Sequence, residues 1–134
     1  MSALQLHSYA NGSRQWDEFL KAVPEKLMAR ASICQYKAGS TICLGESPVK
    51  YVHLILTGTV SAQNVTVTGK VSNWLHMPSP TFIGDLEVLA ERRCYATNVA
   101  TPDGCILARW PVEQFVEAMM EYPRLLLLFS QVLA

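Results

Sequence analysis

The sequence predicts a mainly β domain, an antiparallel sandwich or barrel with helices at both ends. Two observations favour this fold class. Short apolar segments of strand length alternate with turn-forming residues between positions 32 and 110, a pattern typical of sandwiches and barrels. Helical patterns precede and follow these segments. The 134 residues, of which 50% are apolar and 16% charged, suffice for one hydrophobic core but not for two.

The chain is expected to begin with an irregular lead-in, residues 1–14, followed by a helical region. Within residues 15–23 the apolar side chains are spaced as on one face of an amphipathic helix, at Trp16, Phe19, Leu20 and Val23. Pro24 interrupts this pattern, and residues 25–31 predict one further helical turn.

A run of strands is predicted next. The expected strands are 32–36, 41–44, 51–58, 59–67, 71–77, 81–83, 95–100 and 105–110. The turns between them contain the Gly, Pro, Asp and Ser residues that tight reversals require, and they are expected at 37–40, 45–48, 68–70 and 101–104.

Two helices are predicted after the last strand. Residues 112–122 carry apolar side chains along one face. Pro123 suits the first turn of a second helix, which is apolar on every side between Leu125 and Phe129. One small domain is not expected to bury all of these faces.

The predicted site is built around residues 81–100. A short strand ends at Gly84, Asp85 and Leu86 open an apolar helical turn, and a second strand follows. The first backbone N–H groups of a helix are free and favour an anion. Gly84 lets the backbone approach a ligand closely because it has no Cβ. We therefore expect an anion site at the start of this short helix.

This segment resembles the phosphate-binding cassette of the cyclic nucleotide-binding domains, as in catabolite-activator-type bacterial regulators and in regulatory subunits of cyclic-AMP-dependent kinase. Phe82-Ile83-Gly84 stands as in the family pattern, and Asp85 falls on the position of its ribose-binding glutamate. Ala96 falls on the alanine that follows the family's phosphate-binding arginine. Upstream, a glycine repeat of the family is similar to the stretch with Gly39, Ile42, Gly45 and Glu46, and Gly58 matches a family glycine that ends a strand.

Two positions depart from the family pattern. The arginine position is Cys94, and the small residue after it is Tyr95. Arg93 is the nearest substitute, but adjacent strand residues point to opposite faces. The loss of a charged hydrogen-bond partner costs about 1.5–3 kcal/mol, or roughly one to two decades of affinity. The cassette is therefore not expected to bind cyclic AMP tightly.

The resemblance implies an antiparallel β-roll, a double-stranded β-helix similar to a jelly roll, over residues 15–122. It implies the sensor domain of a transcriptional regulator of the catabolite-activator/fumarate-nitrate-regulator (CRP/FNR) type, with a small anionic effector, either a cyclic nucleotide or another anion. The implied ligand-binding residues are Gly84, Asp85, Leu86, Arg93, Cys94, Tyr95 and Ala96.

By the same resemblance, residues 123–134 are expected to be the start of the family's dimerisation helix, truncated at the end of this chain. The implied homodimer contacts are Leu125, Leu126, Phe129, Val132 and Leu133. Binding to DNA is expected only through a domain that is absent from this chain.

Two other functions remain open. The fold could be a degenerate scaffold whose last helix pairs subunits. A cavity filled by the side chain of Tyr95 or Trp74 would favour this scaffold function. A pocket faced by Asp85 and the N–H groups of the cassette would favour the sensor role. A third, thiol-sensing role falls on Cys94, because the two arginines before it make a thiol more reactive.

Other classes of function are not predicted. The net charge is zero, which argues against a nucleic-acid-binding face. Neither a membrane-spanning run nor a signal peptide is recognisable, so a cytoplasmic protein without a membrane partner is expected. Motifs of hydrolases and of phosphate-binding loops are missing, so no enzymatic activity is expected. The four cysteines and three histidines stand singly, and neither a metal site nor a definite cofactor is predicted.

Overall fold

The structure is a computed structural model that describes residues 14–65, 71–78, 80–95 and 98–133. The expectations for residues 1–13, for the turn at 68–70 and for Ala96 lie outside these ranges. The described strands are β1 (Ser32–Tyr36), β2 (Ser40–Cys43), β3 (Tyr51–Val65), β4 (Val71–Pro78), β5 (Thr81–Ile83), β6 (Asn98–Thr101) and β7 (Cys105–Pro111). The described helices are α2 (Arg14–Ala22), α3 (Glu25–Met28), α4 (Asp85–Leu89), α5 (Val112–Glu121) and α6 (Pro123–Leu133).

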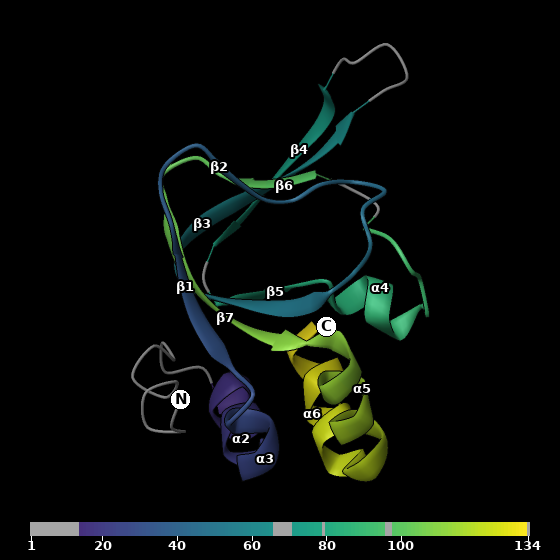
Figure 1. Ribbon diagram of the computed structural model, residues 1–134. Helices are drawn as coiled ribbons and strands as arrows, with labels where there is room; N and C mark the ends of the chain where they lie inside the picture. Colours follow the sequence, from purple (N-terminus) through teal and green to yellow (C-terminus); the bar gives the residue numbers. More distant parts are fainter. Residues whose placement is uncertain (1–13, 66–70, 79, 96–97, 134) are drawn as a thin grey trace.

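All strand pairs are antiparallel, and β3 is the strand on which the sheet is organised. The strand order is β1-β7-β3-β6-β2, and β4 and β5 also pair with β3. The first half of β3 pairs with β7 and β5, and its second half pairs with β6 and β4. Figure 1 shows how the strands curl around a common interior. The predicted β-roll is confirmed.

Gly58 lies where β3 passes from one half of the roll to the other. Its φ of 87° is in the left-handed region that side chains with a Cβ avoid. The pairing of β3 with β7 shifts register between Ile55 and Thr57, just before this glycine. A Cβ on Gly58 would lie 2.4 Å from the carbonyl oxygen of Gly104. The two backbone segments can therefore approach this closely only because residue 58 is a glycine.

Side chains alternate along β3 between two hydrophobic cores. Val52, Leu54 and Leu56 face the helices, whereas Ile55 and Val60 face the interior of the roll. The helix-side core is rich in aromatic side chains, which are Phe19, Phe82, Trp110, Phe115 and Phe129. The interior core is made of the buried side chains of Cys43, Ile55, Val60, Ile83, Tyr95, Val99, Cys105 and Leu107.

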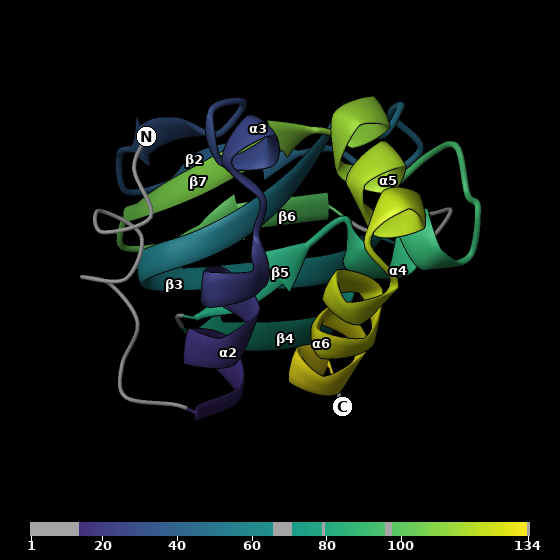
Figure 2. The same ribbon diagram turned by 90° about the horizontal axis from the view of Figure 1, so that it is seen from below.

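The helices cover one side of the sheet, as Figure 2 shows, and α6 packs against both α2 and α5. Trp110 fixes the first helices to β7, because its indole Nε1 donates a hydrogen bond to the carbonyl oxygen of Leu27 at 3.0 Å. The ring of Phe129 on α6 lies 4.9 Å from that of Phe82 and 5.2 Å from that of Phe115. The C-terminal helix is therefore part of the core of the domain.

Several predicted boundaries need correction. The strands expected at 51–58 and 59–67 are one continuous strand, because Gly58 bends β3 without interrupting its pairing. The strand expected at 95–100 is described as β6 from Asn98 to Thr101. Tyr95 precedes this strand and forms backbone hydrogen bonds with Glu46 and Ser47. The helix expected at 25–31 ends at Met28. The other boundaries agree to within one residue.

Candidate functional site

The predicted strand, glycine and short helix are present at the cassette. Gly84 is buried, has a φ of 89°, and accepts a hydrogen bond at its carbonyl oxygen from the Val88 N–H at 3.1 Å. A Cβ at this position would lie 3.0 Å from the carbonyl oxygen of Tyr51. Both the conformation and this contact require a glycine. The backbone of Gly84 therefore lies against β3, and α4 begins with the next residue.

Two of the predicted ligand-binding residues are described only by their backbone. Asp85 and Leu86 are the first residues of α4, but their side chains lie outside what the structure describes, and Ala96 is outside it entirely. The ribose contact expected for Asp85 stays a prediction.

Tyr95 fills the space beneath Gly84. Its side chain is 5% exposed, and its hydroxyl donates a hydrogen bond to the carbonyl oxygen of Tyr51 at 3.0 Å. A Cβ on Gly84 would lie 3.7 Å from Cε1 of the Tyr95 ring. Burial raises the pKa of the Tyr95 hydroxyl, so this group is neutral and offers no charge to an anion.

Backbone pairing with residues 46–49 sets the direction of the side chains at positions 93–95. Tyr95 donates its N–H to Ser47 at 2.8 Å, and Val49 donates its N–H to the carbonyl oxygen of Arg93 at 3.0 Å. The pairing directs Tyr95 inward, whereas Arg93 and Cys94 are both exposed. The ligand-binding roles that the resemblance implies for Arg93 and Cys94 stay predictions.

The predicted dimerisation residues separate into two groups. Leu125 and Phe129 are fully buried in the core of their own domain, and Val132 packs against that core. They are therefore unavailable to a partner in this arrangement. Leu126 is 37% exposed, and the side chain of Leu133 is not described. Among the predicted contacts whose side chains are described, Leu126 is the exposed one, and the dimerisation role stays a prediction.

A cavity of about 320 Å³ opens at the interior face of the roll, where Cys43 and Tyr95 of the interior core and the exposed Leu44, Pro48 and Lys50 line it. His53 on β3 and Arg109 on β7 line this cavity. They are direct partners in the strand register, so their side chains lie next to each other on the same face of the sheet. In the sequence His53 stands singly, and no motif marks Arg109. The alternation of side chains in the two strands was the available signal, because it places both residues on the interior face with Ile55 and Leu107.

His53 is a buried neutral base. It is 3% exposed, and its burial, followed by the nearby positive charge of Arg109, lowers its pKa to about 4. It stacks edge-on against Tyr51 with ring centroids 6.0 Å apart. At neutral pH the imidazole is therefore uncharged, and the cavity contains a neutral donor or acceptor beside a permanent cation.

The buried imidazole predicts a loss of stability in mild acid. An unfolded histidine binds a proton below about pH 6.5, whereas folded His53 does so only below about 4. Stability should therefore fall as the pH falls from 6.5 to 4, by about 3 kcal/mol in all. Urea unfolding at a series of pH values measures this loss. His53→Leu should lack this part of the pH dependence, whereas a variant at exposed His76 should retain it, and equal pH dependence in all three proteins would contradict the assignment.

The cysteines differ in exposure. Cys43 is buried, and burial, with a smaller contribution from Glu87, raises the pKa of its thiol to about 12. Cys105 is buried too, Cys34 is half-buried and Cys94 is exposed, and all four are free thiols. The thiol-sensing hypothesis for Cys94 stays a prediction.

The described residues contain neither a recognisable metal site nor a membrane-spanning helix. In the parts of the chain that the structure describes, no group of three His, Cys, Asp or Glu side chains is placed to hold a metal ion. Among the helices of those same parts, none is both long and apolar enough to cross a membrane.

Comparison with known proteins identifies one family. Residues 33–122 match the family described as the cyclic nucleotide-binding domain. No curated protein matches the sequence. The sensor domain of the transcriptional regulator DNR from Pseudomonas aeruginosa is similar in structure, with a TM-score of 0.73 and 13% identity over 98% of this chain and 83% of that one.

Two longer proteins are also similar. The catabolite activator protein of Thermus thermophilus has a TM-score of 0.70 and 12% identity, over 98% of this chain and 56% of that one. The cyclic-di-GMP-responsive regulator CLP of Xanthomonas campestris has a TM-score of 0.67 and 18% identity, over 81% of this chain and 55% of that one. The chain likewise spans 53% and 57% of two proteins from Silicibacter and Ruegeria pomeroyi, so it corresponds to just over half of such proteins.

Proposed function

Because this chain belongs to the cyclic nucleotide-binding domain family, we propose that it is the sensor domain of a CRP/FNR-type transcriptional regulator whose cassette does not bind cyclic AMP tightly. The observation that carries this proposal is the position of Tyr95, whose ring packs beneath Gly84 and whose hydroxyl is bonded to Tyr51. A phosphate approaching the N–H groups after Gly84 would have to displace this ring. No arginine stands at the family position to compensate, since Cys94 is there and is exposed.

Phe82 supports a sensing role because it links the cassette to the C-terminal helices. It lies two residues before Gly84, and its ring is 4.9 Å from that of Phe129 on α6 and 6.4 Å from that of Phe115 on α5. Trp16 on α2 stacks on the same ring at 5.1 Å. A ligand that moved β5 or α4 would therefore change the packing of α6, and a binding event would bias two arrangements of the helices. In this proposal the partners are a small effector, a second subunit, and DNA contacted by another domain.

A calorimetric titration with cyclic AMP and cyclic GMP tests the cassette proposal. The double variant Cys94→Arg/Tyr95→Ser restores the family's pair and opens the space beneath Gly84. We expect it to bind cyclic AMP about 10–100-fold more tightly than the wild type, from the 1.5–3 kcal/mol of a charged hydrogen bond. Tyr95→Ser alone separates the effect of space from that of charge. A wild type that binds as tightly as the double variant would refute the proposal.

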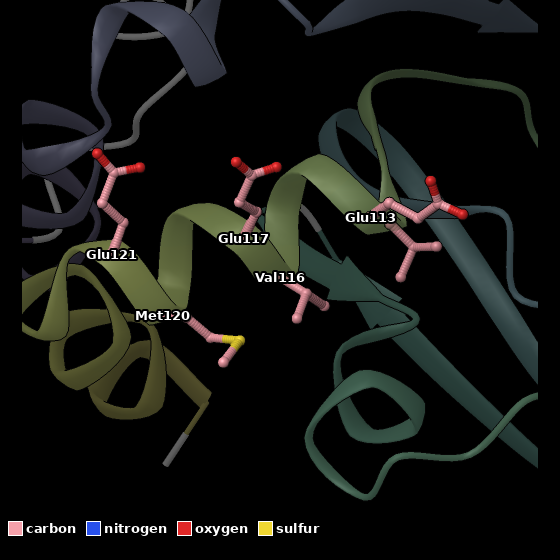
Figure 3. Close-up of a pocket in the computed structure, with 6 residues that line it drawn as sticks. Glu113, Val116, Glu117, Met120 and Glu121 are labelled. Atoms are coloured by element: carbon pink, nitrogen blue, oxygen red, sulfur yellow. The ribbon is translucent and has the colours of Figure 1, made fainter.

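A second candidate function, a scaffold for subunit pairing, is favoured by the same ring of Tyr95 and by exposed apolar side chains on the last two helices. Leu127 is 56% exposed and Met120 is 80% exposed. A shallow hollow of about 720 Å³ runs along α5, and Figure 3 shows Val116 and Met120 pointing the same way, away from the neighbouring glutamates. In this case the partner is a second copy of the chain.

Leu126→Asp is expected to weaken self-association. If this half-exposed leucine is buried between two copies, its loss removes about 1.5–3 kcal/mol, which raises the dimer dissociation constant roughly tenfold or more. Sedimentation equilibrium measures the constant. A wild type that stays monomeric at high concentration would remove the pairing function for this chain.

A further inference from the structure

Two basic side chains on neighbouring strands face the roll interior with nitrogen atoms that lack a partner. His53 and Arg109 are directly opposite each other in the register of β3 and β7. Among the described residues, neither Nδ1 of His53 nor the buried Nε of Arg109 has a hydrogen-bond partner. A buried polar group without a hydrogen-bond partner is unfavourable, so two of them side by side call for an explanation.

The cavity that His53 and Arg109 line explains why these two groups lack a partner: they are placed to bind a ligand. Its volume of about 320 Å³ is at the lower end of the range for small-molecule sites. Its walls are mostly apolar or aromatic, and the residues that define its chemistry are Tyr36, Cys43, Tyr51, His53, Tyr95 and Arg109. Lys50 lies on the exposed rim, and no carboxylate belongs to the described lining. The polar groups that line this cavity are therefore basic or neutral, and the carboxylate of Glu87, which acts on Cys43 and Tyr95, is not among them.

Tyr51 positions the charged group. The Arg109 guanidinium lies over the Tyr51 ring at 4.2 Å from its centroid, which holds the guanidinium plane against an aromatic face. A guanidinium held in this way presents its N–H groups as a fork that matches the two oxygens of a carboxylate. His53 stands one strand away and can add a further hydrogen bond.

We propose that this cavity binds a small monocarboxylate with an aromatic or branched apolar body. Arg109 is the partner of the carboxylate, His53 donates a further hydrogen bond, and Tyr36, Tyr51 and Tyr95 enclose the apolar body. A single negative charge matches the permanent charge of Arg109, whereas a phosphate dianion would leave one negative charge without a partner at this face. The site is separate from the cassette, since Gly84 does not line it, and it shares only Tyr95 with that region.

The proposal does not depend on the proposed function, because binding here is independent of whether cyclic AMP binds at the cassette. Benzoate is the probe, and benzamide is its neutral counterpart of nearly the same shape. Inorganic phosphate tests whether any anion is sufficient. Each is titrated into the folded domain while the ring protons of His53 and the Nε–H of Arg109 are followed by nuclear magnetic resonance.

We expect saturable shifts at both groups with benzoate, at millimolar concentration or below, and at least about tenfold weaker binding of benzamide and phosphate. Arg109→Gln should weaken benzoate binding about 10–100-fold, as the loss of a charged hydrogen bond predicts. Arg92→Gln, at an exposed arginine beside the cassette, should leave it unchanged. The wild-type resonances give the answer even if Arg109→Gln fails to fold.

Three results would overturn the proposal. The first is the absence of saturation with benzoate, and the second is equal binding of benzamide, which would make the charge irrelevant. The third is phosphate binding as tight as that of benzoate, which would mean a general anion site. A titration in which benzoate binds while cyclic AMP does not would support this site and leave the cassette proposal standing as well.

Discussion

Replacing Gly58 by alanine is expected to destabilise the domain by about 3–5 kcal/mol, or to prevent folding. The left-handed backbone costs a residue with a Cβ about 1–2 kcal/mol. The larger part comes from the contact, because the new Cβ would lie 2.4 Å from the Gly104 carbonyl oxygen and 3.0 Å from Cα of Cys105. Both are backbone atoms of the paired strand region, which cannot rotate away. The midpoint of urea unfolding measures the effect.

Gly39 provides a matched control for this substitution. Its φ of 84° is nearly the same, but a Cβ there would have no heavy atom within 4 Å. Gly39→Ala should therefore show only the conformational cost, about 1–2 kcal/mol. If the two variants were equally destabilised, the close approach of the two strands at Gly58 would not exist in solution.

Phe129→Ala is expected to cost about 3–5 kcal/mol, as for other large core aromatics. Phe129 is fully buried on α6, and its ring contacts Phe19, Phe82 and Phe115 from three different elements. Removing it leaves a cavity at the centre of the aromatic cluster and detaches α6 from β5. Thermal or urea unfolding of the purified domain gives the difference directly.

Leu127→Ala serves as the control on the same helix. Leu127 is 56% exposed, and alanine keeps the helix propensity, so the change should stay within about 0.5 kcal/mol. A Phe129→Ala variant no less stable than Leu127→Ala would mean that α6 is not docked on this domain. In that case Leu125 and Phe129 would be available to a second subunit, as the family resemblance implied.

The fold was predictable because its signals are local. The glycine and proline turns separate the strands, and Phe82-Ile83-Gly84 marks the cassette and its short helix. The direction of Tyr95 was not predictable, because it depends on backbone hydrogen bonds of Tyr95 with Glu46 and Ser47, which lie far away in sequence. The docking of α6 could not be predicted for a similar reason. A helix that is apolar on every side does not reveal which side its own domain covers.

The interior cavity shows the same limit. The alternation of β3 and β7 places His53 and Arg109 on the interior face, but their pairing depends on a register that a bulge near Ile55 helps to set. Part of the cavity lining comes from β2 and the segment that follows it, namely Cys43, Leu44 and Ser47. Contacts of this kind depend on long-range packing and not on periodicity.

The most direct measurement of the central claim is the amide spectrum of the labelled domain during a titration with cyclic AMP, read at Gly84, Asp85 and Leu86. These are the N–H groups that a cyclic phosphate would approach at the start of α4, and the ring of Tyr95 packs against Gly84, the first of them. We predict that their resonances show no saturable shift up to millimolar cyclic AMP. A saturable shift at these three amides with a micromolar midpoint would mean that the phosphate reaches the cassette despite Tyr95, and it would contradict the account.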